Sequence, residues 1–269
     1  MIHDVFVTDR AGLATRPNCF ADVQNGELDG VIVKGLFTPE HMTEVSRRVT
    51  DRRDQADDLS FGAMYGFPLN KSGDTRDEYL AEADRFVDVH QELFDLDVRS
   101  LLSDVLRSGS GGRRVDVPVE AGRAYTPVTF RIMSPGLGGL KAHTGNEFTL
   151  LEAESRGMRW LRTEVRVWDC LSFFAVAQTA ESGGRLHLAD LCWNDTPDEW
   201  KVFDQNNRDD SFFDDLPQDA MPLDAGDLIV FAGGRIWHKV SDIGGDRDRI
   251  TFGGFAALRH DDTELWFWS

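Results

Sequence analysis

The spacing of apolar residues in the first third of the chain is mainly helical. Met42, Val45 and Val49 recur at helical spacing. They follow Thr38, which precedes a proline and a glutamate, so that an N-cap residue, a proline at the first helical position and an acidic first turn predict where this helix begins. A second helix is predicted over residues 77–106.

Beyond a Ser/Gly-rich break at residues 108–112, the apolar period shortens to that of strands. Short β-rich runs are separated by Gly, Pro and Asp, and several strands at this spacing predict a sandwich or jelly roll. The runs cover residues 124–133, 171–179, 184–191, 228–231 and 251–258. The acidic, polar segment 204–219 is expected to be an excursion between strands.

These patterns predict a mainly β protein with supporting helices. We predict a single domain over residues 1–269. Within it, residues 1–112 form a mainly helical supporting region and a candidate lid, and residues 113–269 form the β core. The break at residues 108–112 is the alternative domain boundary.

Composition narrows the classes of function. The chain has 29 Lys and Arg against 47 Asp and Glu, for a formal net charge of −18. This argues against a partner that is a nucleic acid or an anionic membrane surface, because such proteins gather excess Lys and Arg. No apolar run is long enough for a membrane helix, and the N-terminus shows no secretory signal. Cys19, Cys170 and Cys192 lack CxxC spacing, which favours a reducing, cytoplasmic location with buried thiols.

Two histidines stand out by their context. His143 follows a Gly-rich turn, and His238 follows a Gly-Asp turn and an apolar strand. Arg249 and Thr251 come on the next β-rich run, where residues two apart share a face. A lone histidine near a strand end is usually a hydrogen-bonding or surface residue. This ordered set, however, is the layout of a double-stranded β-helix that holds ferrous iron and 2-oxoglutarate.

The chemistry explains these residue types. Neutral imidazoles are good ligands for Fe(II), and open coordination positions are needed for the co-substrate and for O2. The far carboxylate of 2-oxoglutarate needs a fixed cation, and the planar fork of Arg249 suits it. Thr251 can donate a hydrogen bond to the same carboxylate.

The third ligand position departs from the usual triad of two histidines and one carboxylate. Gly145 stands two residues after His143, where the carboxylate is expected, and it has no donor atom. We interpret the open position as a chloride site. Two alternatives stay open: Glu147 reaches the metal instead, or the metal site has been lost.

These motifs resemble the iron(II)/2-oxoglutarate-dependent halogenases, most closely the free-standing alkaloid halogenases of the hapalindole pathway, which are related to N-substituted amino acid hydroxylases. The segment 143–148 is similar to the family's His-x-Gly-Asn-acidic-Phe pattern, and segments 233–240 and 249–255 are similar to its distal-His and Arg stretches. The resemblance implies a jelly-roll, cupin-like fold. It also implies that His143 and His238 bind iron, that Gly145 opens the chloride site, and that Arg249 clamps 2-oxoglutarate.

The resemblance further implies chlorination of an unactivated aliphatic C–H of a small-molecule natural product, through an iron(IV)-oxo species and chloride rebound. The cofactors would be Fe(II), 2-oxoglutarate, chloride and O2. A hydroxylase on a small molecule or amino acid derivative is the first alternative, and a non-catalytic barrel that binds a small ligand is the second. The oligomeric state cannot be inferred from the sequence.

Other residues are candidates for supporting roles. Ser172 resembles a family serine that orients the oxo group, and a strand serine bonded to backbone is an equal alternative. The remaining candidates next to the metal are Asn146, Thr129 and Arg131, and for Arg131 we favour a surface ion pair over an anion contact. Met64, Tyr65 and Phe67 form a candidate substrate lid, with core packing as the equal alternative.

Overall fold

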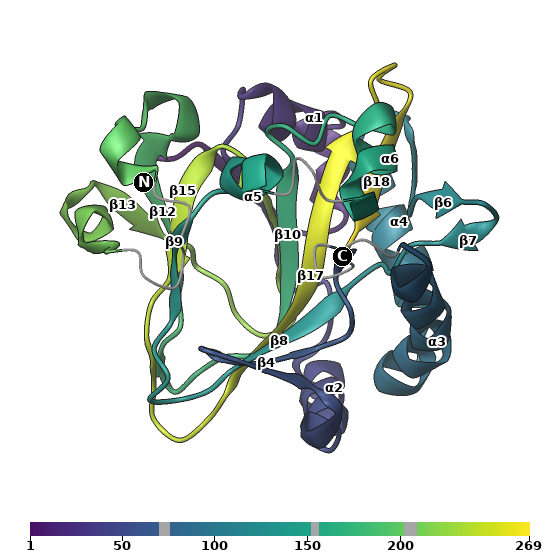
Figure 1. The fold of residues 1–269 in the computed structure, drawn as a ribbon, viewed down its shortest axis with the longest axis horizontal. Helices are drawn as coiled ribbons and strands as arrows, with labels where there is room; N and C mark the ends of the chain where they lie inside the picture. Colours follow the sequence, from purple (N-terminus) through teal and green to yellow (C-terminus); the bar gives the residue numbers. More distant parts are fainter. Residues whose placement is uncertain (70–75, 152–155, 202–208) are drawn as a thin grey trace.

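The computed structural model describes residues 1–69, 76–151, 156–201 and 209–269 (Figure 1). Residues 204–208 of the predicted excursion lie outside these ranges. The helices are α1 (Cys19–Asn25), α2 (Pro39–Thr50), α3 (Arg76–Phe94), α4 (Val98–Ser108), α5 (Gly145–Leu151) and α6 (Arg156–Glu164).

The first nine strands are β1 (Val5–Thr8), β2 (Gly30–Val33), β3 (Asp57–Leu59), β4 (Gly62–Tyr65), β5 (Arg114–Asp116), β6 (Val119–Glu120), β7 (Arg123–Ala124), β8 (Thr129–Met133) and β9 (Leu140–His143). The others are β10 (Leu171–Gln178), β11 (Ser182–Gly183), β12 (Leu186–Cys192), β13 (Gln218–Ala220), β14 (Leu228–Phe231), β15 (Ile236–Val240), β16 (Ile243–Gly244), β17 (Arg249–Leu258) and β18 (Glu264–Trp268).

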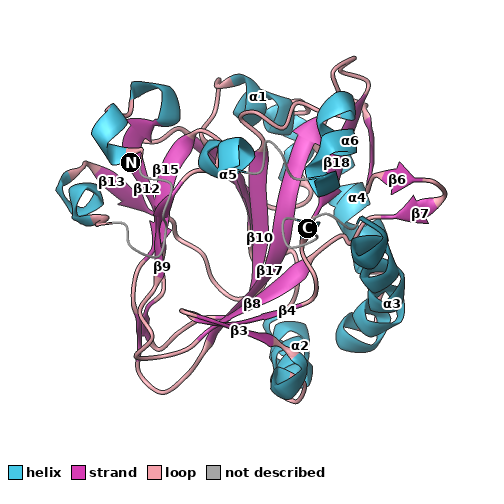
Figure 2. Cartoon of the chain, viewed as in Figure 1, coloured by secondary structure: helices cyan, strands magenta, loops and turns pink. Residues whose placement is uncertain are grey.

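Two sheets build the β core. The large, ten-stranded sheet has the order β1-β2-β14-β10-β17-β8-β4-β3, with β18 beside β17 and β5 beside β18. The small sheet has the order β13-β12-β15-β9. Figure 2 shows the small sheet facing strands β10 and β17 of the large one, with α2, α3 and α4 outside the large sheet. This arrangement is the predicted jelly roll, and it leaves the space between the sheets for a site.

An aromatic cluster attaches the helices to the outer face of the large sheet. Phe94 of α3 packs edge-on against Phe252 of β17, with 4.8 Å between ring centroids, and stacks on Phe130 of β8 at 5.5 Å. Phe252 lies in the middle of β17, so its neighbours Thr251 and Gly253 point to the opposite face, between the sheets. The helical layer therefore fixes the strand that carries the predicted co-substrate residues.

The sequence predictions for the helices are met in part. The Thr38 side chain accepts a hydrogen bond from the His41 amide at 3.2 Å, which confirms the predicted start of α2. The single helix predicted over residues 77–106 is wrong, because it divides into α3 and α4. Asp95 takes a left-handed backbone (φ 57°), and Asp97 then caps α4 by accepting from the Ser100 amide at 3.0 Å.

The first 112 residues supply sheet strands as well as helices. Strand β2 pairs with β14, and β4 pairs with β8. The Ser/Gly-rich break at residues 108–112 is packed: a methyl carbon at Gly109 would lie 2.6 Å from the Cys19 sulfur, and the Gly111 amide bonds the Pro17 carbonyl at 2.5 Å. Because β2 pairs with β14 and β4 pairs with β8, strands from both sides of the break belong to one sheet.

His90 makes the stability of this scaffold depend on pH. It lies buried on α3, with Nε2 3.0 Å from the Val128 carbonyl oxygen, and burial lowers its pKa to about 4. In the unfolded chain its pKa is about 6.5. As the pH falls from 6.5 towards 4, the unfolded chain binds a proton that the folded protein resists. The free energy of unfolding should then fall by up to about 1.4 kcal/mol per pH unit from this group.

We predict that His90→Gln flattens this dependence, because Gln keeps a donor near the Val128 carbonyl and does not titrate. Urea denaturation between pH 7.5 and 4.5 checks the slope. The same slope in the variant and in the unsubstituted protein would contradict the assignment.

Candidate functional site

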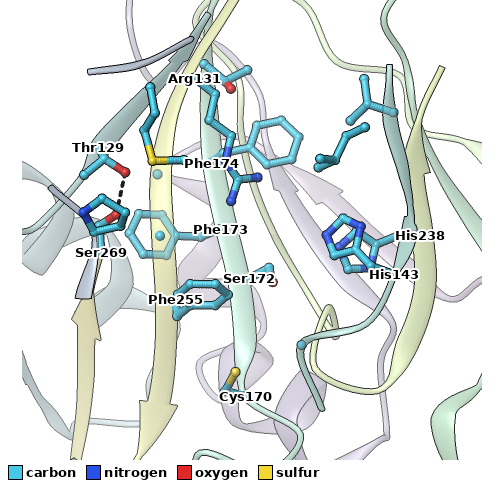
Figure 3. A pocket seen from close by; sticks show the side chains of 18 of the residues that line it. Thr129, Arg131, His143, Cys170, Ser172, Phe173, Phe174, His238, Phe255 and Ser269 are labelled. Atoms are coloured by element: carbon cyan, nitrogen blue, oxygen red, sulfur yellow. Dashed lines mark hydrogen bonds between the residues drawn. The ribbon is translucent and has the colours of Figure 1, made fainter. Parts of the chain in front are cut away.

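A cavity of about 330 Å³ opens between the two sheets (Figure 3). It collects residues from widely separated parts of the chain. Its polar lining includes His143, His238, Arg131, Arg249, Thr251, Ser172, Thr129, Thr149 and Ser269. Its apolar lining includes Phe61, Met64, Leu69, Met133, Met158, Phe173, Phe174, Phe231, Phe255 and Trp268.

The two histidines lie side by side on adjacent strands. His143 ends β9 and is the register partner of His238 on β15, and their ring centroids are 4.2 Å apart. Each Nδ1 bonds a carbonyl oxygen two residues earlier in the chain, that of Lys141 at 2.7 Å for His143 and that of Ile236 at 2.8 Å for His238. A carbonyl only accepts, so Nδ1 carries the proton and each Nε2 keeps its lone pair.

Burial keeps His238 neutral. Its pKa falls to about 4, first because burial disfavours the charged ring and further because of the nearby Arg131 guanidinium. Imidazoles whose Nδ1–H groups are bonded to carbonyls present Nε2 lone pairs, which a divalent metal requires. The residues present therefore fit a ferrous ion held by His143 and His238.

The third position has no side-chain ligand. Within residues 1–69, 76–151, 156–201 and 209–269, no group of three or more His, Cys, Asp and Glu could hold a metal. Gly145 lines the cavity at the start of α5. Glu147 is fully buried on the same helix and is not among the residues that line the cavity, which weighs against its reaching the metal.

Two guanidinium groups face the cavity. Arg249 is 5% exposed; its Nη1 lies 3.6 Å from the Met133 sulfur, and its guanidinium lies 5.3 Å from the centre of the Phe174 ring. Burial lowers the pKa of Arg249 to about 10 and also lowers the pKa of Arg131, so Arg249 stays charged at neutral pH. Among the described residues, neither has an ion pair with a carboxylate. Such a pair of charges favours an anion in the cavity.

Arg131 departs from the interpretation that we favoured from the sequence. It has no ion pair with an acid in the described part of the chain, and Figure 3 shows its side chain directed into the cavity. Thr251 is its register partner across β8 and β17, so these two residues and Arg249 line one wall. The alternation along β8 contained this signal, because Thr129 and Arg131 are two residues apart.

The other candidates for supporting roles differ in whether they line the cavity. Ser172 of β10 lines the cavity. Thr129 lines it too, with its hydroxyl 2.6 Å from that of Ser269. Asn146 is fully buried, and its Nδ2 donates to an Asp169 carboxylate oxygen at 2.6 Å. It therefore contacts the loop before β10.

The predicted lid is not supported. Met64 and Tyr65 belong to β4, which pairs with β8 in the large sheet. Met64 lines the cavity wall, but Tyr65 is 2% exposed and packs against Phe86, with 5.4 Å between ring centroids. Phe67 packs against the main core. Adjacent residues of a strand point to opposite faces, which separates Met64 from Tyr65.

Sequence reasoning missed the aromatic wall of the cavity. Phe173, Phe174, Phe255 and Trp268 line it, together with Met158. Phe255 is an even number of residues from Arg249 on β17, so the period-2 pattern pointed to it. Trp268 lies beside Phe255 because β18 pairs with β17, and that pairing could not be inferred from spacing.

Comparisons with known proteins first define the fold class. An N-substituted L-amino acid dioxygenase from Burkholderia ambifaria AMMD matches 94% of this chain and 91% of its own, with a TM-score of 0.54 and 14% identity. The non-haem alpha-ketoglutarate-dependent carbocyclase SnoK of nogalamycin biosynthesis matches 93% and 88%, with a TM-score of 0.52 and 10% identity. These structures share the jelly roll of the 2-oxoglutarate oxygenases. No curated protein sequence matches the chain.

The family is more specific than the fold. The model of the carrier-protein-independent halogenase WelO5 matches residues 5–269, and the chain belongs to this family. It is therefore a non-haem iron(II)/2-oxoglutarate-dependent oxidoreductase that acts on a small molecule. In the described parts of the chain, no helix is long and apolar enough to cross a membrane.

The two guanidinium groups that face the cavity should lower the free energy of unfolding of the ligand-free protein, compared with a variant that has a neutral side chain in place of one of them. We predict that Arg131→Met raises the free energy of unfolding without ligands by about 1–2 kcal/mol, because the substitution removes a desolvated charge that has no carboxylate partner among the described residues. Urea denaturation in a buffer without carboxylates or phosphate checks this. Lower stability of the variant would show that the guanidinium makes a net favourable contribution.

Proposed function

We propose that this protein chlorinates an aliphatic C–H bond of a small molecule with a largely apolar body. The overall change is R–H, chloride, 2-oxoglutarate, O2 and a proton to R–Cl, succinate, CO2 and water. The observation that carries the proposal is the pair of adjacent imidazoles that line one cavity with Gly145, in a chain of the carrier-protein-independent halogenase WelO5 family.

His143 and His238 are proposed to hold the iron through Nε2. When bound, the iron supplies the oxidising chemistry that activates O2 and breaks the C–H bond. Each Nδ1–H bond to a carbonyl fixes its ring, so the lone pair keeps one direction. The absence of a side chain at Gly145 leaves room for chloride as a further ligand.

The co-substrate contacts are proposed at the opposite wall. Arg249 offers its guanidinium fork to the far carboxylate of 2-oxoglutarate, and Thr251 offers a hydroxyl from the same face of β17. Arg131 adds a second positive charge to this wall. A ligand with two negative charges balances two buried guanidinium groups better than a neutral ligand does.

The remaining lining is proposed to control the outcome. Ser172 brings a hydroxyl to the wall of the cavity that the histidine pair also lines (Figure 3). We assign it to orient the groups on the iron relative to the substrate. Phe173, Phe174 and Phe255 exclude water and hold an apolar substrate in place. Whether the substrate is chlorinated or hydroxylated depends on where its reacting carbon is held, to within about one ångström.

The direct test is a product assay. We expect protein loaded without oxygen with Fe(II), 2-oxoglutarate and chloride to yield chlorinated product on addition of O2 and candidate substrates, with isotope ratios in mass spectrometry as the readout. Hydroxylated product alone would support the hydroxylase alternative. Failure to bind iron or 2-oxoglutarate would favour a non-catalytic barrel.

Substitutions at Gly145 sharpen this test. A methyl carbon there would lie 3.0 Å from the Gly234 Cα, so any side chain requires a small backbone shift. Gly145→Asp fills the open position with a carboxylate and should abolish chlorination, while Gly145→Ala controls for the shift alone. Unchanged chlorination by Gly145→Asp would refute the assignment of the chloride site.

Arg249 is expected to dominate the affinity for 2-oxoglutarate. Arg249→Gln should raise the Kd about 100-fold, because a charge-assisted bidentate contact to the carboxylate is lost. Thr251→Val should raise it only about fivefold, since one neutral hydrogen bond is removed. Anaerobic calorimetric titration gives both constants. Equal effects of the two substitutions would place the carboxylate elsewhere.

A further inference from the structure

Three segments that carry the candidate site are joined at one point behind it. The Gly145 amide donates to the Gly233 carbonyl at 2.7 Å, and the Asn146 amide donates to the Gly234 carbonyl at 2.8 Å. The Gly234 amide in turn donates to the Cys170 carbonyl at 2.8 Å. The start of α5, the turn between β14 and β15, and the loop before β10 are thereby held together.

The side chains of Asn146 and Asp169 complete this junction. Asn146 Nδ2 donates to Asp169 Oδ1 at 2.6 Å, and its Oδ1 accepts from the Asp169 amide at 2.8 Å. Asn146 is fully buried, so the two bonds replace solvent for its amide, while Asp169 is only half-buried. Asp169 has a left-handed backbone (φ 57°), a conformation that Asp and Asn tolerate better than most residues. We call this pair the Asn146–Asp169 strut.

The junction has almost no spare room. A methyl carbon at Gly234 would lie 2.5 Å from the Cys170 carbonyl oxygen, and one at Gly233 would lie 2.2 Å from the Ser172 hydroxyl oxygen. Gly145 meets the same turn at 3.0 Å. A shift of the loop that contains Asp169 would therefore move Ser172 and the glycine turn together, and with them the walls of the open position.

We propose that the Asn146–Asp169 strut is the positioning element that keeps the open position beside Gly145 in register with Ser172, and that it thereby sets the partition between chlorinated and hydroxylated product. This inference rests on the proposed function. Neither side chain lines the cavity, so both act through the segments that they join. The strut spans the segments of His143 and Ser172, whose relative placement fixes which iron ligand lies nearer the substrate.

Three variants test the strut. Asn146→Asp places two carboxylates in contact and removes the Nδ2 donor. Asn146→Ala removes both side-chain bonds without adding a charge, and it replaces the first variant in the test if that variant does not fold. The exchanged pair, Asn146→Asp with Asp169→Asn, restores the side-chain bond with donor and acceptor exchanged and keeps the backbone amide of residue 169 as the donor of the second bond. Asn fits the left-handed position of residue 169.

Gln24→Glu is a matched control outside the site. Gln24 is 7% exposed, its Nε2 donates to the Arg166 carbonyl at 2.9 Å, and its Oε1 accepts from the Leu258 amide at 2.8 Å. The substitution repeats the amide-to-acid change of Asn146→Asp in a buried, doubly bonded position. It therefore reports the effect of general destabilisation.

The first readout is the ratio of chlorinated to hydroxylated product. We expect it to fall about tenfold in Asn146→Asp and Asn146→Ala, to return to within about twofold in the exchanged pair, and to stay unchanged in Gln24→Glu. An unchanged ratio in the two Asn146 variants would overturn the proposal. So would an equal fall in Gln24→Glu.

The second readout does not require turnover. Hydrogen exchange of the Gly145, Asn146 and Gly234 amides in the protein without iron should accelerate about tenfold in Asn146→Ala, and not in Gln24→Glu. The iron(II)–2-oxoglutarate charge-transfer absorption, recorded without O2, should shift only in the Asn146 variants. If the unsubstituted protein makes no chlorinated product, the proposed function fails, and these two measurements still decide the strut. Unchanged exchange and absorption in Asn146→Ala would then reject it.

Discussion

The structure depends on placing two positive charges in a cavity between the sheets, where no carboxylate of the described residues pairs with them. Arg131 and Arg249 face the same space as two imidazoles, and burial keeps His238 neutral. Because the unbalanced guanidinium charges disfavour the empty state, the cavity attracts anions. The acidic exterior, with a net charge of −18 overall, therefore coexists with a positive interior. Local desolvation, and not overall charge, governs what the site binds.

A second constraint is the close approach of backbones around the open position. Gly145, Gly233 and Gly234 meet with distances that leave a side chain little or no space. The space around Gly145 is thus set by three segments that pack together. The same packing places Ser172 against the turn that leads into the strand of His238. Small-residue contacts of this kind transmit displacement directly, since they have no flexible side chain to absorb it.

Much of the fold and the proposed ligand set was accessible from local pattern. The Thr38 cap, the strand runs and the ordered His143, His238 and Arg249 stretches depend on short-range chemistry that the sequence displays. The break between α3 and α4 was missed because it depends on the left-handed Asp95, which no periodicity marks. The lid interpretation of Met64 and Tyr65 was not supported because strand pairing of β4 with β8 decides their faces.

Motif spacing alone indicated which residue types are available for iron, for the co-substrate and for an open coordination position. How these residues lie relative to one another follows from the pairing of distant strands. Pairing of β9 with β15 brings His143 and His238, which are far apart in the sequence, to 4.2 Å between ring centroids. Pairing of β8 with β17 sets Arg131 beside Thr251. The contact between Asn146 and Asp169 likewise joins the start of α5 to the loop before β10. Long-range register and burial set these distances, because the free energy of packing is shared among segments that are far apart in the chain.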